Sequence, residues 1–148
     1  LSRFECEILK TRFSADAEVL SLAHIKNISA EQWENIKFHF HPSLRTLSLD
    51  YNTLDLWLSL DKKTPIISSP LELPAIHLIW RYDYKIYFRR ATEMEAALLK
   101  AIGDGNAFSL ACKIMLDYGS ENQVIEWVIA TISAWIDNGV FSSHRIDF

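Results

Sequence analysis

The chain has 148 residues, of which 49% are hydrophobic and 23% charged, so it is a globular protein rather than a disordered one. Its 15 Lys and Arg against 19 Asp and Glu give a formal charge of −4, which argues against a general binder of nucleic acid or anionic membranes. The longest apolar stretch, residues 127–135, is far shorter than the roughly 20 residues that cross a bilayer, and no charged start followed by an apolar run indicates a signal peptide. Cys6 and Cys112 lack metal-site spacing, so we expect two reduced thiols in a cytoplasmic protein.

The first sixty residues predict a helix followed by a β-hairpin. Apolar residues at helical spacing predict a helix over residues 3–13, and Ser29 with Gln32 is typical of a capping box that opens a short helical turn. Strict alternation of apolar and polar residues predicts strands over residues 36–41 and 45–51, which we expect to pair as a hairpin. A short helix over residues 52–60 follows.

Residues 61–74 contain three prolines and two serines, which predicts a linker before residues 75–148. Beyond it, strands are predicted over residues 75–82 and 85–91, and Asp83 with Tyr84 would connect them as a hairpin. Three helices should follow, over residues 92–102, 108–118 and 121–138. We therefore expect an α+β fold in which a winged-helix-like unit, a β-hairpin plus three helices, follows the N-terminal helix and hairpin. All 148 residues would form a single domain.

The sequence has no nucleotide-binding or common hydrolase motif, namely no GxGxxG, GxxxxGK[ST], GxSxG or HExxH. His39 and His41 alternate on a predicted strand, so both rings lie on one face and a metal could bind between them. No third ligand lies nearby in the sequence, and two polar residues on the solvent side of a strand are the better explanation of the pattern. We expect neither a bound metal nor a cofactor.

The predicted third helix is apolar nearly all round, because Val, Ile and Trp residues recur on every side of residues 124–136. Such a helix is either central to the core or has a second face for a partner. It contains no Lys or Arg and carries a charge of −3, so phosphate would repel it. The hairpin differs, since four basic residues against one Asp give residues 81–90 a charge of +3. That charge suits phosphate or an acidic peptide, or it belongs to a solvated face.

Several blocks of the sequence resemble the HvfC/BufC family. They span nearly the whole chain: residues 4–5, Trp33, residues 41–45 (HPSLR), Leu47, residues 50–52, 56–57, 78–81 (LIWR), 88–89, 95–98 and 108–112. The resemblance implies a non-catalytic protein that holds the leader of a ribosomally made precursor peptide and docks on a multinuclear non-heme iron enzyme. Members of the family usually carry a further N-terminal helical domain, long labelled putative DNA-binding. Because the chain begins with Leu1, we expect it to be the C-terminal part of a longer protein.

The second half is also similar to the RiPP recognition element, a winged-helix domain to which the leader peptide adds as a strand. That similarity implies a groove between the edge strand of the hairpin and the third helix. The residues expected in this groove are Ile86, Phe88 and Arg90 from the strand and Val124, Trp127, Val128 and Thr131 from the helix. The residues expected to make further basic contacts are Arg81, Lys85 and Arg89.

Two alternatives stay open. The first is a winged-helix transcriptional regulator that binds DNA, and the second is a metal-dependent enzyme that uses His39 and His41. The expected partners are the leader peptide and the iron enzyme, with no membrane and no nucleic acid.

Overall fold

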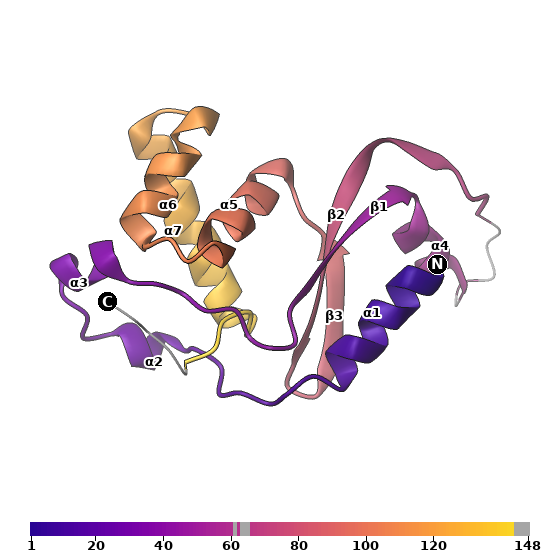
Figure 1. Ribbon diagram of the computed structural model, residues 1–148, viewed down its shortest axis with the longest axis horizontal. Coiled ribbons are helices and arrows are strands. Elements are labelled where there is room, and N and C mark those ends of the chain that lie inside the picture. The colour runs from indigo at the N-terminus through magenta and orange to yellow at the C-terminus, as the bar shows by residue number, and fades with distance from the viewer. Residues whose placement is uncertain (61, 63–65, 144–148) are drawn as a thin grey trace. The chain divides into compact units, whose positions relative to one another are not determined.

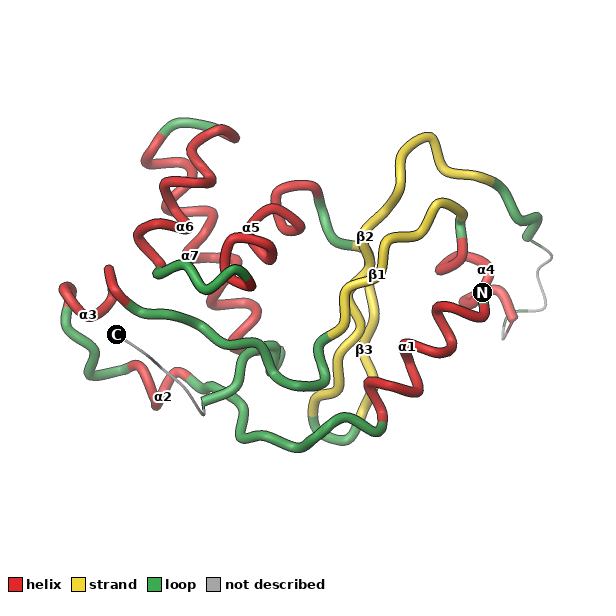
Figure 2. The backbone as a smooth tube through the Cα atoms, viewed as in Figure 1, coloured by secondary structure: helices red, strands yellow, loops and turns green. Residues whose placement is uncertain are grey.

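The computed structural model describes residues 1–60, 62 and 66–143, and shows an α+β protein with one three-stranded antiparallel sheet and seven α-helices among those residues (Figures 1 and 2). The predicted fold class is confirmed. The elements in chain order are α1 (Ser2–Arg12), α2 (Leu22–Ile25), α3 (Ala30–Asn35), β1 (Arg45–Tyr51), α4 (Thr53–Leu60), β2 (Pro70–Tyr82), β3 (Lys85–Arg90), α5 (Glu93–Gly103), α6 (Phe108–Ile114), the 3₁₀ helix η1 (Met115–Tyr118) and α7 (Glu121–Asp137).

The chain forms two compact units, and each is built from two separate segments. Unit 1 comprises Leu1–Ser14 and Ser43–Ala91, and unit 2 comprises Ala15–Pro42 and Thr92–Phe148. The division therefore does not fall in the predicted linker. Of residues 61–74, positions 61 and 63–65 lie outside the described residues, and positions 70–74 belong to β2.

The sheet of unit 1 has the strand order β1-β2-β3, so β2 is central. One face of the sheet is covered by α1 and α4, and its core holds Phe4, Leu47, Leu49 and Ile79. Phe4 is fully buried and meets Trp57 and Phe88 edge-on, with ring centroids 5.6 and 5.5 Å apart. Burying a phenylalanine of this kind stabilises a fold by about 1.5–3 kcal/mol, and the edge-on ring pairs add to that.

The predicted hairpin between residues 36–41 and Arg45–Tyr51 is wrong. β1 pairs with β2 instead, with Leu47 opposite His77. Residues 36–41 belong to no strand, and an isolated bridge joins Phe40 to Phe141. Their alternation has another cause, because Phe38 and Phe40 stack on Phe141 in unit 2, with centroids 4.9 and 5.4 Å apart.

β2 begins earlier than predicted, at Pro70 rather than at Ala75. A proline in a central strand normally removes a ladder hydrogen bond. Here the β1–β2 register shifts between Leu49 and Tyr51, which pair with Ala75 and Pro70. Because of this bulge, no residue of β1 pairs with Pro74, so the strand can accommodate the proline.

The helices of unit 2 pack around a core that contains Val124, Val128, Trp135 and Phe141. The helix predicted from residue 92 is present as α5, and Thr92 and Glu95 form a capping box at its start. The Thr92 hydroxyl accepts from the Glu95 N–H at 3.1 Å, and the Glu95 carboxylate accepts from the Thr92 N–H at 3.0 Å. The box at Ser29 and Gln32 is present as well. The helix predicted over residues 108–118 is not α-helical throughout, because from Met115 onward it continues as the 3₁₀ helix η1.

Candidate functional site

The outer edge of β3 is an open strand edge, because the described strands place a neighbour only on the β2 side. Asp83 and Tyr84 form a two-residue turn with φ values of 49° and 60°, as in a type I′ hairpin. In such a hairpin the flanking residues, Tyr82 and Lys85, exchange both backbone hydrogen bonds, and bonded and non-bonded pairs then alternate. The Ala91 N–H bond to the Ile76 carbonyl, 2.8 Å long, continues that alternation.

This register determines which backbone groups reach the open edge. Ile86, Phe88 and Arg90 lie in the non-bonded pairs opposite Arg81, Ile79 and His77. Their N–H and C=O groups therefore point away from β2. These are the three strand residues predicted for the peptide groove, and their backbone groups form a row along which another strand can pair.

The side chains of β3 divide between the two faces of the sheet. Ile86 and Phe88 pack against the core that contains Phe4. On the opposite face, Tyr87 stacks on Trp80, with ring centroids 5.5 Å apart. Lys85 shares that face and is exposed. An added strand would thus meet an apolar row on one face of the sheet and an aromatic, basic row on the other.

The basic residues of the hairpin have different roles. The Arg81 guanidinium donates to the carbonyls of Arg12 at 2.6 Å and Ser14 at 3.2 Å, so it holds the end of α1 on the sheet. Arg89 donates to the Arg90 carbonyl at 3.3 Å. Lys85 and Arg90 are exposed beside the open edge. Of the basic residues predicted here, Arg81 therefore has a clear structural role.

The helix residues predicted for the groove belong to unit 2, whereas the strand residues belong to unit 1. Val124 and Val128 are 1% and 0% exposed and form part of the unit 2 core. Trp127 and Thr131 are half-buried on one flank of that buried stripe. The contribution of α7 to a peptide groove stays a prediction.

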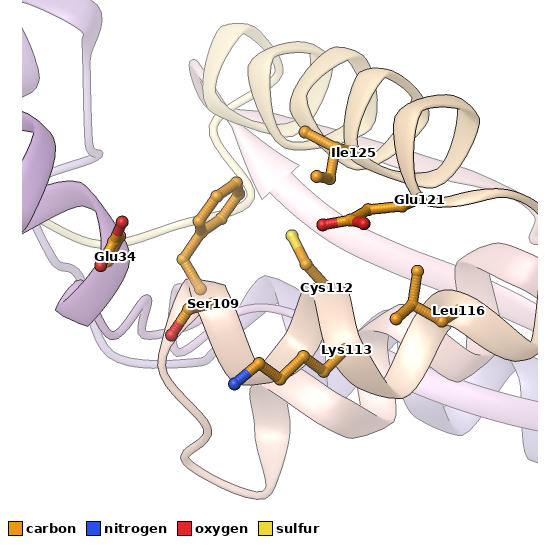
Figure 3. Close-up of a pocket in the computed structure, with 8 residues that line it drawn as sticks. Glu34, Ser109, Cys112, Lys113, Leu116, Glu121 and Ile125 are labelled. Atoms are coloured by element: carbon orange, nitrogen blue, oxygen red, sulfur yellow. The ribbon is translucent and has the colours of Figure 1, made fainter.

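A cavity of about 480 Å³ lies in unit 2 between α6 and α7 (Figure 3). In it, Cys112 points toward Glu121 and Ile125 of α7, and Glu34 of α3 lies across the opening. Burial raises the pKa of the Cys112 thiol, so the sulfur is protonated at neutral pH and a weak nucleophile. Sequence reasoning missed this cavity, because Glu34 of α3 lines it together with α6, η1 and α7, which come much later in the chain.

The surroundings of His39 and His41, the pair considered above as metal ligands, are ordinary. His41 is buried, and its Nε2 lies 3.1 Å from the Ala17 carbonyl oxygen, with which it makes a hydrogen bond. His39 is half-buried. Within the described part of the chain, no three His, Cys, Asp or Glu side chains lie close enough together to hold a metal ion.

Fold and site together define an α+β protein with an open, basic sheet edge. A scan against protein-family models finds no match, and searches of curated proteins and of solved structures find none either. Among the described helices, none is long and apolar enough to cross a membrane.

Proposed function

We propose that this chain is a non-catalytic peptide-binding protein that holds an extended peptide as an added strand along the outer edge of β3. The observation that carries the proposal is the row of outward backbone groups at Ile86, Phe88 and Arg90. In strand addition, main-chain hydrogen bonds supply affinity and neighbouring side chains supply choice. Lys85 and Arg90 are exposed beside that row and favour an acidic peptide.

The resemblance to the HvfC/BufC family supports a particular peptide and a particular partner. The peptide is the leader of a ribosomally made precursor, and the partner is a multinuclear non-heme iron enzyme that modifies it. The protein then acts in the cytoplasm, where the exposed, unpaired Cys6 stays reduced.

The rival proposal of DNA binding has less support. In a winged helix the third helix enters the major groove, where Arg and Lys meet phosphate and base edges. The helix in that position, α7, has no Lys or Arg and carries Glu121, Glu126 and Asp137. A regulator would thus have to bind through the hairpin alone.

Hydrogen exchange of the full chain tests the proposal. The probe is a synthetic leader peptide from a precursor encoded beside an iron-enzyme gene. We expect the amides of Ile86, Phe88 and Arg90 to gain protection when the leader binds. The amides of Lys85, Tyr87 and Arg89 already bond to β2 and are the internal control. Binding without this alternation, or no binding, would contradict strand addition.

A matched pair of variants isolates the backbone contribution. Arg90→Pro removes an outward N–H and the charge but leaves the β2 ladder intact, whereas Arg90→Ala removes only the charge. We expect the proline variant to bind the leader more weakly than the alanine variant. Equal affinities would show that the Arg90 backbone does not bond to the peptide. A salt-dependent shift of duplex DNA that Arg89→Ala with Arg90→Ala abolishes would favour the regulator instead.

A further inference from the structure

A second cavity of unit 2, of about 440 Å³, lies among α2, α3, α6 and α7. The residues that line it range from buried to exposed. At its floor, Ile25 of α2 and Ile132 and Ile136 of α7 are 6%, 2% and 5% exposed. At its rim, Leu22 and Ile129 are 55% and 50% exposed. This cavity therefore has depth, unlike a flat apolar face, and it is called the apolar recess below.

Two aromatic rings form one wall of the apolar recess. Trp33 of α3 and Phe108 of α6 both line it, and their rings meet edge-on with centroids 5.8 Å apart. Phe108 also lines the cavity beside Cys112, and its contact with Trp33 separates the two spaces. The apolar recess is thus bounded on this side, so it suits a compact ligand better than a long chain.

The lining of the apolar recess is uncharged. Every described residue that lines it is aliphatic or aromatic except Ser133. A carboxylate or phosphate bound there would lose its water without a positive side chain to compensate, which is costly. The Ser133 hydroxyl makes no hydrogen bond to the described part of the chain, so it can bond to a ligand. These features favour a neutral apolar body with one polar group.

The volume of the apolar recess sets the size of the ligand. An apolar cavity of about 150 Å³ in another protein holds one benzene molecule. A volume of about 440 Å³ is close to three times as large and lies within the usual range for ligand pockets. By this comparison, a molecule of about 10–15 non-hydrogen atoms fits.

We propose that the apolar recess binds a neutral, largely apolar small molecule of this size, typified by two fused aromatic rings, whose one polar group bonds to Ser133. The rings lie between the isoleucines of the floor and the wall of Trp33 and Phe108. Aromatic side chains favour such contacts, since ring pairs add to the free energy gained from burial alone. The inference goes beyond strand addition at β3, because it concerns another unit and another class of ligand.

Calorimetry and methyl NMR with the full chain test the proposal. The probe is 2-naphthol, a neutral molecule with two fused rings and one hydroxyl. We expect saturable binding of one molecule per chain, with the largest methyl shifts at Ile25, Ile129 and Ile132. The control ligand, 2-naphthoate, has the same rings and a carboxylate, and it should bind at least about tenfold more weakly.

Two tryptophan variants form a matched pair. Ala30 and Ala134 are both exposed helical residues, and of the two only Ala30 lines the apolar recess. Ala30→Trp should occupy part of the recess and weaken 2-naphthol binding at least about tenfold. Ala134→Trp adds the same side chain outside the recess and should leave the affinity unchanged.

Ser133→Ala isolates the hydroxyl. It should weaken 2-naphthol binding about threefold to tenfold, because a hydrogen bond is lost, and should leave naphthalene binding unchanged. An unchanged affinity for 2-naphthol would overturn the assignment of Ser133.

The proposal as a whole fails if 2-naphthol does not bind saturably, or if the two tryptophan variants have equal effects. Binding of 2-naphthoate as tight as that of 2-naphthol would overturn the neutral class of ligand. A dimer in ultracentrifugation that 2-naphthol dissociates would show that a second copy covers the apolar recess instead. Leader binding at β3 is measured separately with the Arg90 variants, so failure of either proposal leaves the other standing.

Discussion

The two units expose different kinds of surface because a sheet and a helix satisfy their backbone hydrogen bonds in different ways. Unit 1 buries one face of a sheet and leaves the backbone groups along the edge of β3 open. Unit 2 is helical, and a helix satisfies its own backbone, so what α7 has left to offer is a face of side chains. Unit 1 therefore exposes main-chain groups that a further strand can pair with, whereas the surface of unit 2 offers side chains.

The largest effect should come from removing the core of unit 1. Phe4→Ala deletes a fully buried ring that contacts Trp57 and Phe88, and we expect a loss of about 3–5 kcal/mol in the free energy of unfolding. Urea denaturation measures this loss. Native-state hydrogen exchange should show that β1, β2 and β3 lose most of their protection.

Two further variants show whether the units are separately stable. Phe13→Ala lies just after α1, where Phe13 is 80% exposed, and should cost little. Phe141→Ala deletes the ring on which Phe38 and Phe40 stack. We therefore expect the amides of α7 to lose protection against hydrogen exchange before those of the sheet do. If Phe4→Ala and Phe141→Ala expose the same amides, the two units unfold as one and the comparison fails.

A smaller effect on stability is expected at the N-terminus of α5, in unit 2. Thr92→Ala removes the hydroxyl that caps α5 and should lower the free energy of unfolding by about 1 kcal/mol. Thermal and urea denaturation measure it. Ser120→Ala is the matched control, since Ser120 occupies the same position before α7 but its side chain makes no capping hydrogen bond. An equal loss in both variants would show that the hydroxyl bond contributes nothing.

At the hairpin of unit 1 we expect a gain. Tyr84 has a φ of 60° and its side chain is 98% exposed, so it bears backbone strain without packing in return. Left-handed backbone costs a non-glycine residue about 1–2 kcal/mol, and the greater flexibility of glycine offsets part of that. Tyr84→Gly should therefore raise the free energy of unfolding by about 0.5 kcal/mol. Tyr84→Ala keeps the strain, and a similar gain in that variant would rule out backbone relief.

The last prediction concerns pH. His77 is buried in β2, where its Nδ1–H donates to the Ala75 carbonyl at 3.2 Å. Burial, with Arg90 nearby, lowers the pKa of His77 below 6.5. As the pH falls, the unfolded chain binds a proton at His77 before the folded chain does. The contribution of His77 to the free energy of unfolding is therefore fully present above about pH 6.5 and is lost as the pH drops toward the lowered pKa. Denaturation between about pH 7.5 and 5 should show that His77→Gln reduces this dependence.

Features that depend on a few neighbouring residues were predicted correctly, whereas the pairing of distant segments was not. The capping box predicted at Ser29 is contained within four residues, and it is present. The partner of β1 could not be read in the same way. The alternation of residues 36–41 suits a strand, but it arises from packing on Phe141, a hundred residues later.

The same limit applies to the candidate sites. The similarity to a peptide-binding winged-helix domain pointed to Ile86, Phe88 and Arg90, and the register gives their backbone groups the direction of the open edge. The apolar residues on every side of α7 indicated a second apolar face, but no sequence pattern predicted that Leu22 and Trp33 would line a cavity beside it.

The division of the chain between units has a consequence for synthesis on the ribosome. The chain passes from one unit to the other at Ser14, Pro42 and Ala91, so no single cut yields either unit whole. Phe4 emerges early, but the sheet that buries it is finished only with β3. Unit 2 is completed later, because Phe141 is made about a hundred residues after Phe38 and Phe40. On the growing chain, the apolar side chains of α1 and of the segment with Phe38 therefore stay exposed until the later residues that bury them are made.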